Sequence, residues 1–249
     1  MTSSIAFIGK SGSGKTTLVK AFAKFIKKNF TQSSILLVDN DLTLELSNSF
    51  GIKTRNTIYG IKSGKHEYKT GIPDGMSKQE YIEWALEDII IEVDENVDMI
   101  ASWFVTPKDC ICPSTKLMRD SLSKLISRYD FVIFDCEYDL KYLNLLVDCP
   151  IDEAIIVSKC SKENIALSAQ IADSSRKYVN DGQMGVILNK VQKNMLSQTV
   201  ELLNSFELKL LGSIENQEEI NIDKMYGEIE NIYSRLNLPQ IEGWPIKWV

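Results

Sequence analysis

A glycine-rich segment near the N-terminus constrains the fold of this chain more than any other feature. It follows a short apolar run at residues 5–8 and precedes apolar residues spaced as on one face of a helix. The segment fits the pattern G-x-x-x-x-G-K-[ST], which binds phosphate where a strand turns into a helix. We call residues 9–17 the P-loop; they read Gly9-Lys10-Ser11-Gly12-Ser13-Gly14-Lys15-Thr16-Thr17.

The residue types in the P-loop predict a nucleotide site. Glycines let the backbone N–H groups surround an anion, and the N-terminus of the following helix adds partial positive charge. Lys15 is expected to reach the β- and γ-phosphates, and the Thr16 hydroxyl is expected to bind Mg²⁺. ATP or ADP with Mg²⁺ are therefore the predicted ligands, and ATP hydrolysis is the predicted reaction.

Apolar runs and amphipathic patterns alternate along the rest of the chain. The runs are rich in Ile, Val, Leu and Phe without polar alternation, which is typical of parallel strands covered on both faces. The predicted fold class is α/β, a doubly wound and mostly parallel sheet with helices on both faces, in a single domain spanning 1–249. Strands are predicted at 5–8, 35–38, 99–101, 131–134, 154–157, 186–188 and 208–214, and helices at 16–28, 114–127, 162–177 and 196–206.

One segment, at about 51–98, interrupts this alternation and is predicted to be a surface insertion. Its first part is polar and glycine-bearing, and it holds His66, the only histidine, which is either a solvated loop residue or a functional one. Residues 77–80 read as a capping box. A helix is predicted after it, because apolar residues recur at helical spacing as far as Val93.

Carboxylates follow two of the predicted strands. Asp39 and Asp41 follow the run at 35–38, and Asp135 follows the run at 131–134. Ligands of open parallel sheets bind beyond the carboxyl ends of the strands. Asp135 is therefore predicted to lie near Mg²⁺, with Asp39 as a further Mg²⁺ ligand, and Asp39 or Asp41 is predicted to orient the attacking water. Asn189-Lys190 follows a later strand and is predicted to contact the nucleotide base.

The composition of the chain argues against several classes of function. The 249 residues carry 28 Lys and Arg against 34 Asp and Glu, a net charge of −6, and no basic stripe, so we expect no nucleic-acid partner. No apolar run approaches the roughly 18–20 residues that cross a bilayer, so no membrane association is expected. A strand predicted so close to Met1 leaves no room for a targeting segment, and the five cysteines are expected to be reduced in the cytoplasm.

Lys10 adds a second lysine that a phosphate-binding loop does not require. At this residue the chain resembles the deviant Walker A ATPases, the group that includes MinD, ArsA and the nitrogenase iron protein. The resemblance implies a homodimer in which Lys10 reaches the phosphates bound to the other subunit. Such a cation would act like an arginine finger on the charge of the transition state.

A pair of cysteines narrows the resemblance further. Cys110-Ile111-Cys112-Pro113 precedes a predicted helix, and two thiolates from each of two chains would make four sulfur ligands for Zn²⁺ or Ni²⁺. With the P-loop, Asp39, Asp135 and Asn189-Lys190, the chain resembles the CooC-type maturation ATPases. That resemblance implies a nickel chaperone, metal-bound at Cys110 and Cys112 across the dimer, which acts on carbon monoxide dehydrogenase or acetyl-CoA synthase.

The chain also departs from that family, and other functions stay open. After Asp135-Cys136-Glu137 the family continues Ala-Gly, whereas this chain reads Tyr138-Asp139, which predicts slow hydrolysis. One alternative is a nucleotide-sensing scaffold or a MinD-like partner ATPase with little hydrolysis. The segment 244–249 carries one lysine and lacks the basic amphipathic pattern of a membrane-binding tail. The other alternative is an iron–sulfur reductase like the nitrogenase iron protein, for which Cys149 stands some way beyond Asp135-Cys136-Glu137 in the place of the usual second cysteine.

Overall fold

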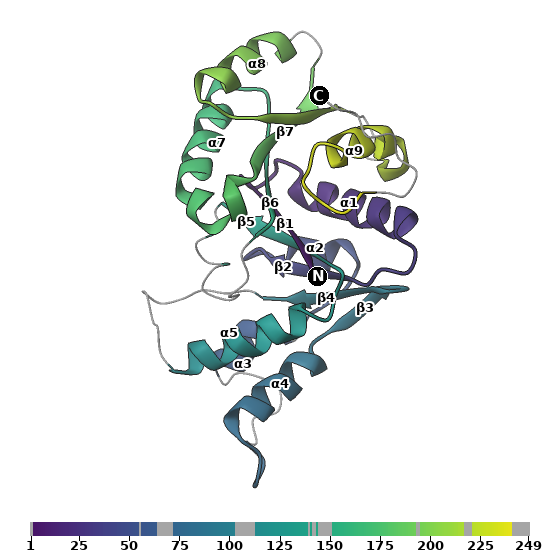
Figure 1. Ribbon diagram of the computed structural model, residues 1–249, viewed down its shortest axis with the longest axis vertical. Helices are drawn as coiled ribbons and strands as arrows, with labels where there is room; N and C mark the ends of the chain where they lie inside the picture. The colour runs from purple at the N-terminus through teal and green to yellow at the C-terminus, as the bar shows by residue number, and fades with distance from the viewer. Residues whose placement is uncertain are drawn as a thin grey trace.

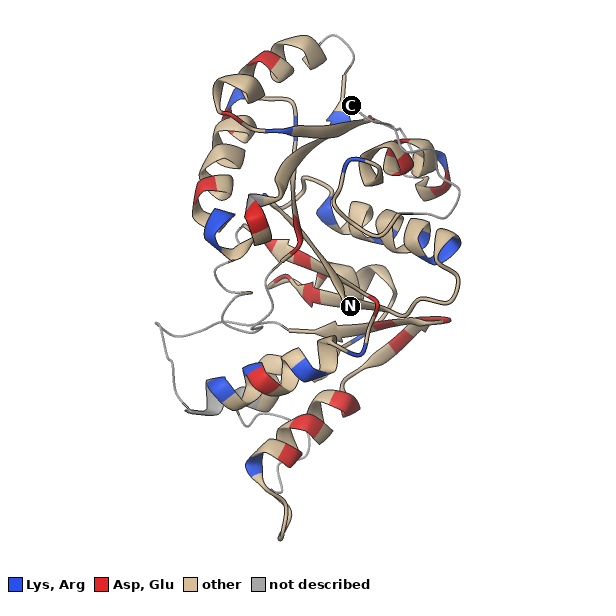
Figure 2. Cartoon of the chain, viewed as in Figure 1, with Lys and Arg blue, Asp and Glu red and all other residues tan. Residues whose placement is uncertain are grey.

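The described part of the chain forms one sheet with helices on both faces (Figure 1). A computed structural model describes residues 2–54, 56–63, 72–102, 113–138, 140, 143, 151–192, 195–216 and 221–240. Acidic and basic side chains are interspersed over these residues (Figure 2). Within them, no helix combines the length and the apolar composition that crossing a membrane would need.

The sheet has eight strands in the order β3-β4-β2-β5-β1-β6-β7-β8. All neighbours pair in parallel except β3, which runs antiparallel to β4. This confirms the predicted doubly wound α/β class, and each predicted strand occurs. The strands are β1 (Ser3–Gly9), β2 (Ile35–Asn40), β3 (Ile91–Asp94), β4 (Val97–Ala101), β5 (Phe131–Glu137), β6 (Glu153–Ser158), β7 (Met184–Val191) and β8 (Leu210–Glu215).

Each face of the sheet has its own apolar core. Successive β1 side chains alternate between the two cores, with Ala6 and Ile8 in one and Ile5 and Phe7 in the other. Residues of α1, α2 and α9 fill the second core, and residues of α3, α4, α5, α7 and α8 fill the first. In Figure 1, α1 and α9 accordingly lie on one side of the sheet and α7 on the other.

The described helices include those predicted at 16–28, 114–127, 162–177 and 196–206, each within two residues of its expected ends. They are α1 (Lys15–Asn29), α2 (Glu45–Ser49), α3 (Ile58–Ser63), α4 (Lys78–Asp88), α5 (Pro113–Ile126), α7 (Lys162–Ser175), α8 (Leu196–Ser205) and α9 (Tyr226–Tyr233). Short 3₁₀ turns occur at η1 (Arg176–Tyr178), η2 (Asn180–Gly182) and η4 (Ile222–Met225).

The segment at about 51–98 differs from the predicted surface insertion, because residues of α3 and α4 belong to one core and β3 belongs to the sheet. The capping box is present, because the Ser77 hydroxyl accepts from the Glu80 N–H and the Glu80 carboxylate accepts from the Ser77 N–H. The helix, however, ends at Asp88, and Val93 lies in strand β3 instead of on a helical face. Pairing of β3 with β4 supplies backbone hydrogen bonds that helical spacing alone could not reveal.

Phe22 tests how much the α1 core contributes to stability. Its side chain is fully buried, and its ring meets that of Phe7 edge-on with centroids 5.0 Å apart. We expect Phe22→Ala to lower the free energy of unfolding by about 3–5 kcal/mol, because a cavity replaces a buried ring. Urea denaturation measures the change. Phe206→Ala is the matched control, because Phe206 is 40% exposed and should lose less than about 1 kcal/mol.

Candidate functional site

The P-loop lies at the carboxyl end of β1, next to the point where the strand order reverses. From β1 the chain continues through α1 to β2 on one side, and from its neighbour β6 it continues through α7 to β7 on the other. Gly9, Gly12 and Gly14 have φ values of 150°, 74° and 97°, which L side chains rarely adopt. Gly14 is the N-cap of α1 and no side chain caps the helix there. The first N–H groups of α1 therefore have no side-chain acceptor, which suits them to a phosphate.

Asn189 holds the P-loop from the side of β7. Its Nδ2 donates to the Ser13 carbonyl at 2.8 Å, and its Oδ1 accepts from the Lys190 N–H at 2.9 Å. A Cβ atom at Gly14 would lie 2.2 Å from this Nδ2, so the close approach requires glycine. The structure thus gives Asn189 a role in shaping the loop, in addition to the base contact that the sequence predicted.

Thr16 and Asp135 meet at the centre of the site. The Thr16 hydroxyl donates to Asp135 Oδ2 at 2.6 Å, and Lys15 beside them is only 2% exposed. Burial raises the pKa of the Asp135 carboxyl to about 7, against the opposing effects of the Thr16 hydrogen bond and the Lys15 charge. The nearby carboxylates of Asp39 and Asp41 contribute to this rise. The site therefore holds a buried carboxylate that a cation would stabilise.

The arrangement of Thr16 and Asp135 fits a Mg²⁺ ion with bound nucleotide. Asp135 Oδ1 is buried and has no hydrogen-bond partner, and a hydroxyl and a carboxylate are the oxygen ligands that Mg²⁺ prefers. Both residues lie beside the P-loop lysine, and their contact with Mg²⁺ stays a prediction. Among the described residues no group of three or more His, Cys, Asp or Glu side chains could by itself hold a metal. Mg²⁺ bound here would accordingly need phosphate or water ligands as well.

Asp39 and Asp41 lie at the same edge of the sheet but have local partners. Asp39 is the register partner of Asp135, and its Oδ2 accepts from the Ser47 N–H at 2.8 Å and the Ser47 hydroxyl at 2.6 Å. Asp41 Oδ1 accepts from the Thr43 N–H at 2.8 Å and from its hydroxyl at 2.5 Å. Burial raises the pKa of Asp39 despite its bonds to Ser47. Asp39 therefore anchors α2 to the site.

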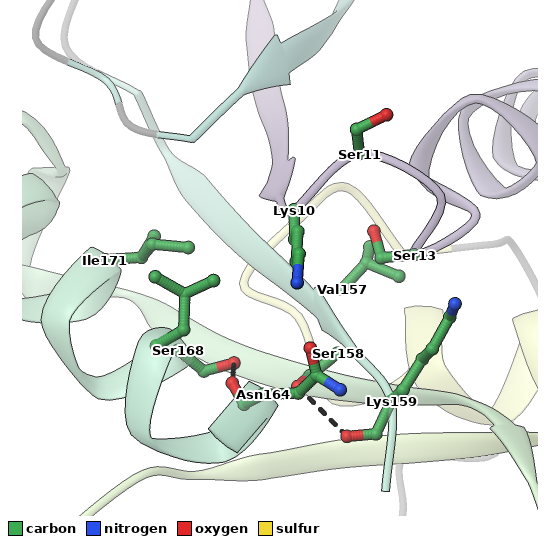
Figure 3. Close-up of a pocket in the computed structure, with 10 residues that line it drawn as sticks. Lys10, Ser11, Ser13, Val157, Ser158, Lys159, Asn164, Ser168 and Ile171 are labelled. Atoms are coloured by element: carbon green, nitrogen blue, oxygen red, sulfur yellow. Dashed lines mark hydrogen bonds between the residues drawn. The ribbon is translucent and has the colours of Figure 1, made fainter. Parts of the chain in front are cut away.

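Two pockets flank the P-loop. One, of about 60 Å³, includes Gly14, Thr17 and both Asn189 and Lys190 in its wall, together with residues at the end of β8 and after it. The other, of about 120 Å³, lies between the P-loop, β6 and α7 and contains Lys10 (Figure 3). Sequence reasoning did not identify Ser47 or the β6–α7 residues of the second pocket. The only sequence signal for the latter is the Ser161 cap, which marks where α7 begins beyond β6.

Several predicted features lie outside the described residues. These are Cys110 and Cys112, His66, Asp139, Cys149 and the C-terminal segment 241–249. Tyr138, next to Asp139, is described: it is 49% exposed and has a φ of 62°, the left-handed conformation that glycine adopts most easily. Cys136 and Cys160 are buried, as expected for cysteines outside the predicted metal pair.

Known proteins resemble this chain in sequence and in fold. A family model described as an AAA domain matches residues 2–180. An uncharacterized ATP-binding protein of Methanocaldococcus jannaschii is 26% identical over 219 residues, covering 87% of this chain and 85% of that protein. A plasmid partition protein of Borrelia burgdorferi has a TM-score of 0.66 at 23% identity, covering 94% of this chain and 99% of that one. The MinC:MinD cell division complex of Aquifex aeolicus gives a TM-score of 0.65 at 14% identity, covering 94% and 95%. These solved structures share the P-loop NTPase fold of this chain.

The raised pKa of Asp135 predicts a pH dependence of stability. The unfolded chain loses this proton near the ordinary value of 3.8 and the folded chain near 7. Between these values the folded state holds the extra proton, so the free energy of unfolding falls as the pH rises from about 4 to about 7. We expect Asp135→Asn to remove this fall, which is at most about 4 kcal/mol. Denaturant titrations of the nucleotide-free protein measure it.

The exposed Asp88 provides the control for this prediction. Asp88→Asn should leave the pH profile of the parent unchanged. The free energy of unfolding of Asp135→Asn should instead rise relative to that of the parent between about pH 4 and about pH 7. Parallel profiles for Asp135→Asn and the parent would contradict the assignment of a strongly desolvated carboxylate at this position.

Proposed function

The chain belongs to this AAA domain family, and from that membership we propose that it is a Mg²⁺-dependent ATPase whose nucleotide state controls the pairing of two copies. The observation that carries the proposal is the hydrogen bond between Thr16 and the buried Asp135, with the second Asp135 oxygen unpartnered beside Lys15. These groups provide the cation, hydroxyl and carboxylate that nucleoside triphosphate chemistry requires.

Different residues of the site would have different roles in ATP hydrolysis. The P-loop backbone and Lys15 hold the phosphates, while Thr16 and Asp135 would hold Mg²⁺, which neutralises charge on the phosphate oxygens. Asp39 or Asp41 would orient the water, since each lies at this edge of the sheet with one of its oxygens held by a neighbouring N–H and hydroxyl. Water then attacks the γ-phosphorus and ADP leaves. The base would occupy the pocket beside Lys190.

Lys10 links the chemistry to dimer formation. Its side chain is exposed, and the P-loop pattern does not specify a lysine at this position. We propose that it contacts the phosphates of the second copy, so that ATP favours the dimer and hydrolysis releases it. Cytoplasmic location, homodimerisation and the absence of nucleic-acid and membrane partners belong to this proposal.

Two lysine variants test the proposal. Lys15→Ala should weaken both ATP and ADP binding by at least about 100-fold, because the phosphates lose their buried cation. Lys10→Ala should leave nucleotide binding by the single chain within about threefold and impair ATP-dependent dimerisation. Calorimetry and light scattering, each with ATP and with ADP, measure the two effects. If both variants bind ATP like the parent, the assigned site is incorrect.

A finer proposal concerns the metal that this ATP-dependent dimer would deliver. We propose that the dimer is a metallochaperone that helps insert nickel into a client enzyme of the carbon monoxide dehydrogenase or acetyl-CoA synthase type. The support is Cys110-Ile111-Cys112, whose four thiolates in a dimer would make a Ni²⁺ or Zn²⁺ site. A MinD-like partner ATPase and a nucleotide-sensing scaffold use the same nucleotide site without a metal, and an iron–sulfur reductase would contain iron.

Metal analysis separates these functions. The parent should bind about one Ni²⁺ or Zn²⁺ per dimer, with weaker binding at low pH because protons compete for the thiolates. The double variant Cys110→Ser/Cys112→Ser should lose this metal. The control, Cys160→Ser, changes a buried thiol and should keep it. Elemental analysis beside thiol titration gives the result, and unchanged stoichiometry in the double variant would refute the shared cysteine site.

A further inference from the structure

We propose that the pocket between the P-loop, β6 and α7 binds inorganic phosphate, and that it holds the phosphate released by hydrolysis. This inference rests on the proposed ATPase function. We call it the phosphate pocket. Its wall includes Lys10 and Ser13 of the P-loop, Ser158 and Lys159 from the end of β6, and Asn164 and Ser168 of α7.

The charge of the phosphate pocket favours an anion. Lys10 enters it from the P-loop and Lys159 stands at the end of β6 (Figure 3). Among the described wall residues there is no carboxylate to neutralise these two ammonium groups. The N-terminal turn of α7, a helix of 14 residues, adds partial positive charge on the same side through Asn164. An oxyanion is therefore the class of ligand that this wall stabilises.

A buried hydroxyl provides an independent sign of a missing ligand. Ser13 is 4% exposed and forms part of the pocket wall, yet its Oγ has no hydrogen-bond partner. Leaving a buried hydroxyl unpaired is unfavourable, so such groups normally have a partner. The other two buried wall hydroxyls donate to backbone carbonyls, Ser158 to Lys159 at 3.3 Å and Ser168 to Asn164 at 2.9 Å. A phosphate oxygen would accept from Ser13.

The size and position of the phosphate pocket suit the product of hydrolysis. Its volume is about 120 Å³, well above the roughly 10–15 Å³ that one water needs on the same measure. It shares Lys10, Ser11 and Ser13 with the P-loop, so a released phosphate passes directly from one to the other. While Lys10 binds phosphate here, it does not reach a second copy. Phosphate release therefore precedes the next pairing of two chains.

The test is a titration of the full chain, saturated with ADP and Mg²⁺, with inorganic phosphate. We expect one saturable site per chain by calorimetry. Lys159→Met should weaken phosphate binding at least about tenfold, because it removes a charge-assisted hydrogen bond. The matched control is Lys162→Met, an exposed lysine three residues away that is not part of the wall; it should bind phosphate like the parent.

Other arms distinguish this proposal from its alternatives. Lys15→Ala without nucleotide should still bind phosphate; loss there would place the anion in the P-loop itself and overturn the proposal. Unchanged phosphate affinity in Lys159→Met would also overturn it, even if that variant altered dimerisation. A parent that binds ADP but not phosphate would refute the phosphate pocket alone. A parent that does not bind ADP would refute the proposed function.

Discussion

The hydrogen bond from Thr16 to Asp135 is the contact on which the organisation of this site depends. It joins the helix that begins at the P-loop to the neighbouring strand β5, and it exists because β1 and β5 pair in parallel and in register. The bond satisfies one carboxylate oxygen and leaves the other buried and unpartnered. A carboxyl group desolvated in this way keeps a proton up to about pH 7, even with Lys15 beside it, unless a metal ion binds. The fold therefore builds a site that is unfavourable when empty and suited to a metal-bound phosphate.

The same edge of the sheet positions the residues around this bond. Asp39 is opposite Asp135 in the sheet register and is held by both the N–H and the hydroxyl of Ser47, which ties the short helix α2 to the end of β2. On the other side, Asn189 bonds the Ser13 carbonyl and fixes the P-loop against β7. The ends of β5 and β7 thus hold the P-loop through Thr16 and Ser13, and the phosphate pocket lies where that loop faces the end of β6. Nucleotide, metal and released phosphate would share a single set of polar groups.

Particular residues show why some of this could be read from the sequence and some could not. Asp135 was predictable because a carboxylate after four apolar residues, in a chain with a P-loop, has few other roles. Val93 was assigned to a helix because its spacing from Ile89 is helical, whereas pairing with β4 makes it a strand residue. Helix α2 has only five residues and depends on the bonds between Asp39 and Ser47, which no local pattern reveals.

By itself, the sequence determined the phosphate-binding loop, the class of sheet and the edge at which the acidic residues gather. Those features are local, since they follow from glycine conformations, apolar runs and the direction of parallel strands. Only the tertiary structure decided which acidic residue meets Thr16, that Asn189 braces the loop, and that Lys10, Ser13 and Lys159 border one pocket. These contacts join residues more than a hundred positions apart, and they are set by strand order and register, which the pattern of single residues does not encode.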